Sequence, residues 1–310
     1  MYSRFKSLED GGEAELESLR NSRAAVVGLG ATGTVIAENL ARHGVKLALI
    51  DRDFLEMNDC YSSNIYEPKH CEENLPKARA AEKKLGKFTE VESHVKSIRS
   101  SQDSVLHRAD VIMDGTDNIE TRRVINSVSK RKGIPWVYTA TVGSRGCSAF
   151  FKDECFDCLV EEVSPGSVDT CESTGLMREV SGIAGLRSSL KAVRYLAGGS
   201  PDEKLDLVPG GESLKMDSDG CRVCEEKKSV EIPRTATSVC GENKYEINRK
   251  TDGKSIERLR ESSDSFFENE YLARGETETG KITLFREGRA IVEAESRGQA
   301  EQLFSETVGV

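Results

Sequence analysis

The stretch that decides the fold is "AAVVGLGATGTVIAENLARHG", residues 24–44. Its apolar start predicts a buried strand, and a glycine-rich turn then leads into a helical pattern. Gly28, Gly30 and Gly33 follow the spacing G-x-G-x-x-G. Such a turn lets the backbone approach a phosphate closely and directs helix N-terminal amides toward the anion. A second interpretation, in which the glycines only allow the helix to pack on the strand, stays open here.

Acidic residues end the next apolar segment, "KLALIDRD". Asp51 follows the glycine turn by about 20 residues, the spacing at which a carboxylate can accept a hydrogen bond from a ribose hydroxyl. Asp53 lies two positions further on. This pattern suits NAD, FAD and ATP alike, so it predicts a nucleotide site without naming the nucleotide.

The first half of the chain alternates between strand and helix patterns. This alternation predicts an α/β fold with a Rossmann-like, doubly wound, mostly parallel sheet. After residue 150 it stops, and a cysteine-bearing region precedes a helical pattern at 181–198. We expect strands at 24–28, 46–51, 91–98, 110–116 and 135–141, and helices at 32–43, 76–86 and 118–131.

Composition excludes several classes of protein. The 310 residues are 37% hydrophobic, which suits a globular protein with a sizeable core. The net charge of −9 argues against a nucleic-acid partner. No apolar run approaches the roughly 20 residues of a membrane span, and the N-terminus has no signal core, so we expect no membrane partner and a cytoplasmic location. The nine cysteines then favour metal or thiol chemistry over a disulfide framework.

A polar cluster in "VIMDGTDNIETRR" separates the nucleotide classes. Asp114, Asp117, Asn118 and Arg122 lie where a predicted strand ends and a predicted helix begins, the sheet edge at which ligands bind. Magnesium prefers carboxylate oxygens, and an arginine can hold phosphate oxygens in a fork. The cluster therefore favours a magnesium nucleotide over NAD, although Asp117 has an alternative role as a helix N-cap.

Two C-x-x-C motifs predict a metal centre. Cys155 and Cys158 lie in "CFDC", and Cys221 and Cys224 lie in "CRVC". Four thiolates in two such pairs are typical of tetrahedral zinc. A redox role is less favoured because neither motif follows a strand at a helix start, as a thioredoxin-like site does. A closed shell of four sulfurs has no open position, so the predicted zinc is structural.

The motifs "GLGATG", "DRDFLE", "LPKARAA", "DGTDNIETR", "CFDC", "TCESTG" and "CRVC" occur in the order found in the ThiF/MoeB family, the relatives of ubiquitin-activating enzymes, which this chain resembles over residues 1–228. The resemblance implies an adenylation domain over 1–228 that binds ATP and Mg²⁺. It also implies a homodimer, and a partner that is a ubiquitin-like modifier or sulfur-carrier protein whose C-terminal Gly-Gly is adenylated.

The resemblance further implies roles for single residues. Lys77, in "LPKARAA", corresponds to the lysine that neutralises triphosphate charge, although alone it reads equally as a solvated helix lysine. Asp117 corresponds to the magnesium-associated aspartate, with Asn118 and Arg122 beside it. Arg4, in "YSRF", corresponds to the arginine that reaches the partner subunit's ATP. The nucleotide itself would be held by Gly28, Gly30, Gly33, Asp51 and Asp53.

Cys171, in "VDTCESTG", is the candidate nucleophile. Polar surroundings and a following helix would lower the pKa of its thiol. It corresponds to the family's crossover-loop cysteine, which in different members forms a thioester or persulfide link or is dispensable. A helix-start cysteine without a role is the alternative.

One stretch departs from the family pattern. "NDCYSS" puts Ser62 where the family has a phosphate-contacting arginine, and Asp59 where it has an asparagine. Losing that contact would cost about 2–4 kcal/mol of transition-state stabilisation. Either another cation such as Arg145 substitutes, or the chain is a weak homologue that acts as a scaffold for a ubiquitin-like protein. An NAD or FAD oxidoreductase is disfavoured by "DGTDN" and the cysteine pairs.

Residues 229–310 read as a small α+β domain without a catalytic constellation. Two interpretations stay open for it. One is a docking module for the carrier or a downstream acceptor, and the other is a domain that only packs on the core and stabilises a dimer.

Overall fold

The structure is a computed structural model that describes residues 12–159, 175–216, 221–232, 237–238, 243–247, 253–286 and 288–309. The chain divides into two compact units, Met1–Ile232 and Pro233–Val310. Among the described residues, no helix combines the length and the apolar character needed to cross a membrane.

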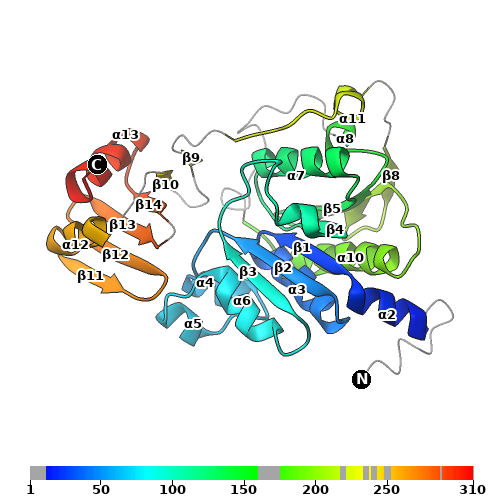
Figure 1. The fold of residues 1–310 in the computed structure, drawn as a ribbon, viewed down its shortest axis with the longest axis horizontal. Coiled ribbons are helices and arrows are strands. Elements are labelled where there is room, and N and C mark those ends of the chain that lie inside the picture. The colour runs from blue at the N-terminus through cyan, green and yellow to red at the C-terminus, as the bar shows by residue number, and fades with distance from the viewer. Residues whose placement is uncertain are drawn as a thin grey trace. The chain divides into compact units, whose positions relative to one another are not determined.

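The first unit is built on an eight-stranded sheet with the order β3-β2-β1-β4-β5-β6-β7-β8 (Figure 1). Neighbouring strands from β3 to β5 pair in parallel, and β6, β7 and β8 extend the sheet in antiparallel fashion. The expected α/β fold with a mostly parallel sheet is therefore confirmed. The strands are β1 (Arg23–Val27), β2 (Lys46–Asp51), β3 (Val91–Val95), β4 (Val111–Asp114), β5 (Trp136–Val142), β6 (Arg145–Phe151), β7 (Lys204–Val208) and β8 (Ser213–Lys215).

Helices cover both faces of this sheet. Helices α3 (Ala31–Arg42) and α10 (Arg178–Leu196) lie together on one face, and α7 (Ile119–Lys132) lies on the other (Figure 1). The chain moves outward in one direction from β1 and in the other from β4, so the carboxyl ends of β1 and β4 form the switch point where ligands bind in such folds. The remaining helices are α2 (Glu13–Asn21), α4 (Met57–Ser62), α5 (Pro68–Glu72), α6 (Lys77–Leu85), η1 (Leu106–Arg108), α8 (Phe156–Leu159) and α11 (Arg222–Glu226).

The core under α7 is aromatic. Trp136 is fully buried, and its ring centroid lies 5.0 Å from that of Phe151 and 6.1 Å from that of Phe156. Each such side chain contributes about 1.5–3 kcal/mol when it leaves water. The central strands β1 and β2 are buried on both faces, which explains why their sequences are continuous apolar runs rather than alternating ones.

The antiparallel part of the sheet was not expected from the sequence. Strand β6 returns directly along β5, with Val142 opposite Arg145, and β7 and β8 then add to the edge. The apolar residues of β6 follow a tight turn at 143–144 and not a helix. The βαβ pattern on which the expectation was based therefore does not apply to this strand.

The second unit is a small α+β fold, as expected. Its antiparallel sheet has the order β11-β12-β13-β14-β10-β9. Both helices pack apolar residues against the same core, which contains Ile282, Leu284, Leu259 and Phe304. The elements are β9 (Thr237–Ser238), β10 (Lys244–Ile247), α12 (Gly253–Glu261), β11 (Ser265–Glu268), β12 (Leu272–Thr277), β13 (Gly280–Phe285), β14 (Ala290–Glu293) and α13 (Arg297–Thr307).

Candidate active site and metal centre

The three glycines of the turn after β1 have different surroundings. A Cβ on Gly33 would lie 1.9 Å from the carbonyl oxygen of Gly28, and one on Gly28 would lie 2.6 Å from that of Gly115. Gly28 also has a φ of +85°, which L side chains rarely adopt. At Gly30, by contrast, no heavy atom of the described residues beyond its two chain neighbours lies within 4 Å of the Cβ position. Gly28 and Gly33 therefore serve backbone packing, whereas Gly30 borders open space at the N-terminus of α3.

Asp51 at the end of β2 is bound to this turn. One of its carboxylate oxygens accepts a hydrogen bond of 2.6 Å from the Leu29 amide, and the other accepts one of 2.7 Å from the Asp53 amide. Burial is the main reason that the pKa of Asp51 is raised to about 6, and the charge of Asp53 adds to the effect. The side chain of Asp51 thus lies beside the glycine turn.

Lys77 is the first residue of α6, and its charge acts on Asp51. Its amide donates to the carbonyl oxygen of Asp53 over 2.8 Å, which fixes the first turn of α6 beside the end of β2. Its ammonium nitrogen lies 2.8 Å from Oδ1 of Asp59, a residue of α4. Both side chains are only 15% exposed. Lys77 is therefore a held cation within the site and not a solvated helix lysine.

Three carboxylates surround this cation. Burial alone lowers the pKa of Lys77, but the charges of Asp59, Asp51 and Asp53 more than offset burial and raise it above its usual value. The ammonium group stays charged throughout the physiological range. It also partly neutralises the acidic residues, as it would have to neutralise a polyphosphate.

Two residues of this group were not expected from the sequence to contribute. In the sequence, Asp59 is notable only because it departs from the family pattern. Nothing in the sequence indicates that it pairs with Lys77. Tyr66 was missed, and its buried hydroxyl donates to the carbonyl oxygen of Leu29 over 2.9 Å, which supports the glycine turn from behind. No signal in the sequence indicates the role of Tyr66, because it depends on the path of the chain after α4.

The start of α7 holds the second polar group. The N-cap is Asn118, whose Oδ1 accepts from the Thr121 amide over 2.9 Å, so the N-cap interpretation of Asp117 is wrong. Asp117 is exposed at the carboxyl end of β4, and Asn118 Nδ2 donates to it over 3.4 Å. Its carboxylate is thus placed at the ligand-binding edge of the sheet, where it could hold a magnesium ion.

Arg122 points into the protein interior. Its Nε donates to Asp114 Oδ2 over 3.0 Å, and one terminal nitrogen donates to the carbonyl oxygens of Thr116 and Thr139. Its guanidinium also lies 5.0 Å from the centroid of the Tyr138 ring. These contacts show that Arg122 ties the turn after β4 to β5.

The departure at Ser62 leaves no cation at that position. The hydroxyl of Ser62 donates within α4 to the carbonyl oxygen of Asp59 over 3.3 Å. Arg145, the candidate substitute, is exposed at the first position of β6. Arg4 and Cys171 lie outside the described residues, so their expected roles stay predictions.

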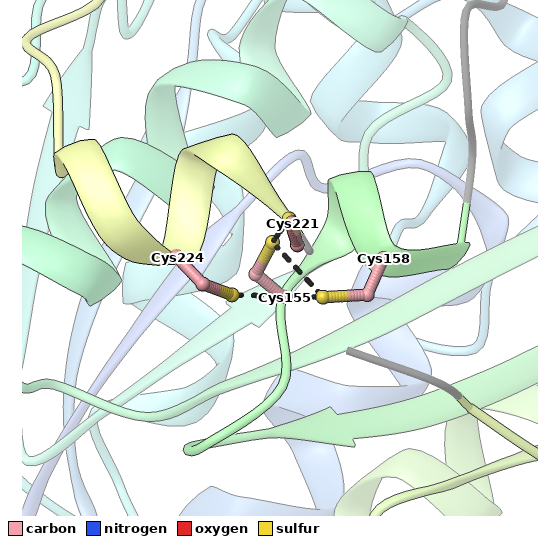
Figure 2. Close-up of side chains that lie close together, drawn as sticks. All are labelled: Cys155, Cys158, Cys221 and Cys224. Carbon is pink, nitrogen blue, oxygen red and sulfur yellow. Dashed lines mark hydrogen bonds between the residues drawn. The ribbon is translucent and has the colours of Figure 1, made fainter. Parts of the chain in front are cut away.

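The four cysteines of the two C-x-x-C motifs converge on one point (Figure 2). Their sulfur atoms all lie within 4.8 Å of one another, with 3.5 Å from Cys158 to Cys155 and to Cys224, and 3.6 Å from Cys155 to Cys221. Tetrahedral zinc with bonds of about 2.3 Å needs sulfurs about 3.8 Å apart. The donor set and spacing therefore fit a zinc ion.

The polypeptide around the cysteines prepares this geometry. Asn126 of α7 is buried, and its Oδ1 accepts from the Phe156 amide over 3.0 Å while its Nδ2 donates to Asp157 over 2.7 Å. Burial raises the pKa of the Cys155 thiol to about 12. A metal ion would therefore have to displace protons, which makes its binding dependent on pH.

Comparisons with known proteins place this chain among its relatives. The model of the ThiF family matches residues 2–229. The sulfur carrier protein ThiS adenylyltransferase of Bacillus subtilis is 29% identical over 315 residues, which cover 94% of each chain. The SAMP-activating enzyme E1 of Haloferax volcanii is 29% identical over 205 residues, which cover 63% of this chain and 74% of that protein. A crystal structure of E. coli MccB with MccA-N7isoASN superposes with a TM-score of 0.60 at 18% identity, over 72% of this chain and 74% of that one, and so shares the fold.

Proposed function

This chain is an adenylyltransferase that belongs to the ThiF family, and we propose that it adenylates the C-terminal glycine of a ubiquitin-like modifier or sulfur-carrier protein ending in Gly-Gly. The observation that carries the proposal is the glycine turn itself: it has open space at Gly30, its Leu29 amide donates to Asp51, and the charge of Lys77 acts on Asp51. This arrangement offers amides, a ribose acceptor and a cation within one site.

Each part of ATP then has a partner. The amides at the start of α3, beside Gly30, face the phosphates. Asp51 accepts from a ribose hydroxyl, and Asp53 lies next to it. Lys77 turns from Asp59 to the triphosphate, where its positive charge offsets the charge that develops on the leaving pyrophosphate.

Asp117 is the residue that would hold Mg²⁺, because its carboxylate is exposed at the sheet edge. Bound there, the ion supplies charge stabilisation for the phosphates. The carboxylate of the carrier's terminal glycine attacks the α-phosphorus, forms the acyl-adenylate and releases pyrophosphate. Asn118 and Arg122 maintain the turn that presents Asp117.

The later steps and the assembly extend this proposal. The acyl-adenylate passes its acyl group to the thiol of Cys171 as a thioester, with release of AMP, or to another sulfur donor as part of a persulfide route. Zn²⁺ at the four cysteines is structural. A homodimer brings Arg4 to the partner's nucleotide, and a row of half-exposed apolar side chains on α10 (Ile183, Leu186 and Leu190) offers a surface for such contact.

A second candidate function is a scaffold that binds a ubiquitin-like protein without efficient activation. It is favoured by Ser62, whose hydroxyl bonds within α4 where the family has an arginine. The pairing of Lys77 with Asp59 also favours it, because this pairing withholds the cation from a nucleotide.

Exchange of labelled pyrophosphate into ATP distinguishes adenylation of a carrier from the scaffold function. The full chain with Mg²⁺ is assayed with a panel of ubiquitin-like proteins that end in Gly-Gly. Adenylation predicts exchange that depends on one carrier, at least 10-fold above the reaction without carrier. Asp117→Asn should lower it at least 10-fold, whereas Asp202→Asn, which changes an exposed aspartate paired with Lys204, should not. Carrier binding without exchange would support the scaffold instead.

A further inference from the structure

Two cysteines beside the nucleotide site lie in direct contact. The Sγ atoms of Cys60 in α4 and Cys71 in α5 are 3.0 Å apart. Both residues are half-buried, and neither belongs to the C-x-x-C motifs. The two short helices follow each other in the chain and pack together (Figure 1). The contact therefore lies within one compact segment of the chain.

A metal does not explain this pair. Among the described residues, the only group of three or more candidate ligands is the cluster of four cysteines at 155–158 and 221–224. The sulfurs of that cluster are 3.5–3.6 Å from their neighbours, whereas Cys60 and Cys71 are closer. A disulfide bond of about 2.05 Å requires them to approach by only about 1 Å more.

The cysteine pair is connected to Lys77 through Asp59, the residue before Cys60. The thiol of Cys71 donates to the carbonyl oxygen of Glu56 over 3.3 Å, and the amide of Glu56 donates to Asp59 Oδ2 over 2.9 Å. The other oxygen of Asp59 lies 2.8 Å from the Lys77 ammonium nitrogen. Oxidation of Cys71 removes the thiol proton and with it the bond to Glu56. What then holds α4 is the covalent bond to Cys60, the residue that follows Asp59.

We propose that Cys60 and Cys71 are a redox modification site, at which a reversible disulfide fixes α4 against α5 and keeps Lys77 on Asp59, so that the oxidised protein binds Mg-ATP more weakly. The disulfide itself follows from the thiol contact. Its effect on ATP rests on the proposed function. Disulfides in intracellular proteins are usually transient and often sense redox state, which suits a pair adjacent to a binding site.

The oxidant is a small disulfide such as oxidised glutathione. The Cys60 thiolate attacks one of its sulfurs and releases one glutathione thiolate, and Cys71 then attacks Cys60 of the mixed disulfide and releases the second. Two thiols are oxidised, one glutathione disulfide is reduced to two thiols, and two protons leave with them. Cys71 acts second because burial and its bond with Cys60 raise the pKa of its thiol to about 12.

The first measurement is a peptide map of the full chain after treatment with oxidised glutathione. Trypsin cuts after Arg52, Lys69 and Lys77, so the disulfide joins peptides 53–69 and 70–77. We expect this linked pair in most of the oxidised protein and its loss with dithiothreitol. Cys60→Ser should abolish it, whereas Cys147→Ser, which removes a half-buried thiol elsewhere, should leave it intact. An oxidised protein without the linked pair would overturn the proposal.

The second measurement is the dissociation constant of Mg-ATP for reduced and oxidised protein. We expect oxidation to raise it at least 3-fold in the wild type and to leave Cys60→Ser unchanged. Zinc content is measured in parallel, so that oxidation of the other cluster is detected. A linked pair with unchanged ATP binding would overturn the regulatory part. Absence of ATP binding in the reduced protein would overturn the proposed function. The peptide map would still show whether the disulfide between Cys60 and Cys71 forms.

Discussion

The ammonium nitrogen of Lys77 lies 2.8 Å from Oδ1 of Asp59, and the two residues belong to different helices, α6 and α4. The cation that we propose for the triphosphate is therefore already paired with a carboxylate. A nucleotide must compete with Asp59 for it. Under the proposed function, the affinity for ATP therefore depends on the strength of that pair as well as on the contacts that ATP itself makes.

Asp59→Asn should release Lys77 without changing the shape of the site. Because Asp51 and Asp53 still keep the lysine charged, we expect Mg-ATP to bind about 3- to 10-fold more tightly. Lys77→Met should weaken binding at least 10-fold and lower the free energy of unfolding by about 3 kcal/mol, since it leaves buried carboxylates unpaired. Calorimetric titration measures the affinity for Mg-ATP, and denaturant unfolding measures the free energy of unfolding. If Asp59→Asn weakens binding, Asp59 contributes directly to the nucleotide site.

Asp51 should make stability depend on pH. Its pKa in the folded protein is raised by burial from 3.8 to about 6, so the folded state retains a proton that the unfolded state has already released. The free energy of unfolding should therefore fall as pH rises from about 4 to about 6, by up to about 3 kcal/mol. Asp51→Asn lacks this titration. Denaturant unfolding across that range should show wild type losing stability relative to Asp51→Asn, but not relative to Asp202→Asn. Parallel curves for wild type and Asp51→Asn would contradict the shift.

Substitutions at two glycines of the turn should affect nucleotide binding and stability separately. Gly30→Ala adds a methyl group to open space, so we expect stability within about 1 kcal/mol of wild type and at least 10-fold weaker Mg-ATP binding. Gly33→Ala places the same group 1.9 Å from the Gly28 carbonyl oxygen, and should cost more than about 3 kcal/mol. This loss would occur although alanine is ordinarily favoured inside a helix. Thermal unfolding and ATP titration of both variants test the distinction, and equal ATP binding by Gly30→Ala and wild type would contradict it.

The four clustered cysteines should hold one zinc ion per chain. Elemental analysis should show loss of the ion in Cys158→Ser and Cys224→Ser and retention in Cys147→Ser, which lies outside the cluster. Removal of the metal should lower the free energy of unfolding by several kcal/mol, on the order of 3 or more. Acidification should release the ion, because ligation requires the thiols to lose their protons. Retention of zinc by Cys158→Ser would exclude this ligand set.

Features encoded in short stretches of sequence were predictable. The buried strands β1 and β2 appear as continuous apolar runs, and the turn at Gly28 and the start of α7 follow from local residue types. The resemblance to the ThiF/MoeB family, drawn from the order of such short motifs, is confirmed by the family match. The two C-x-x-C motifs were found for the same reason, although their meeting point depends on the fold.

Features that depend on contacts between distant elements were not predictable. The pairing of Lys77 with Asp59 and the approach of Cys60 to Cys71 arise from the path of α4 and α5. Arg122 was expected beside the magnesium site, but its guanidinium is held by Asp114, because only the fold shows which way a side chain on a helix points. The return of β6 along β5 was missed for the same reason.

The cysteine cluster also has a consequence for the unfolded chain. Its two motifs are far apart in sequence, and the segment between them contains α10, β7 and β8. An ion bound to all four sulfurs would close that segment into a ring, and a ring of this length removes roughly 4 kcal/mol of conformational freedom from the denatured ensemble. Part of the stability of α10, the helix that packs on α3, would then come from unfolded conformations that the metal-bound chain cannot adopt.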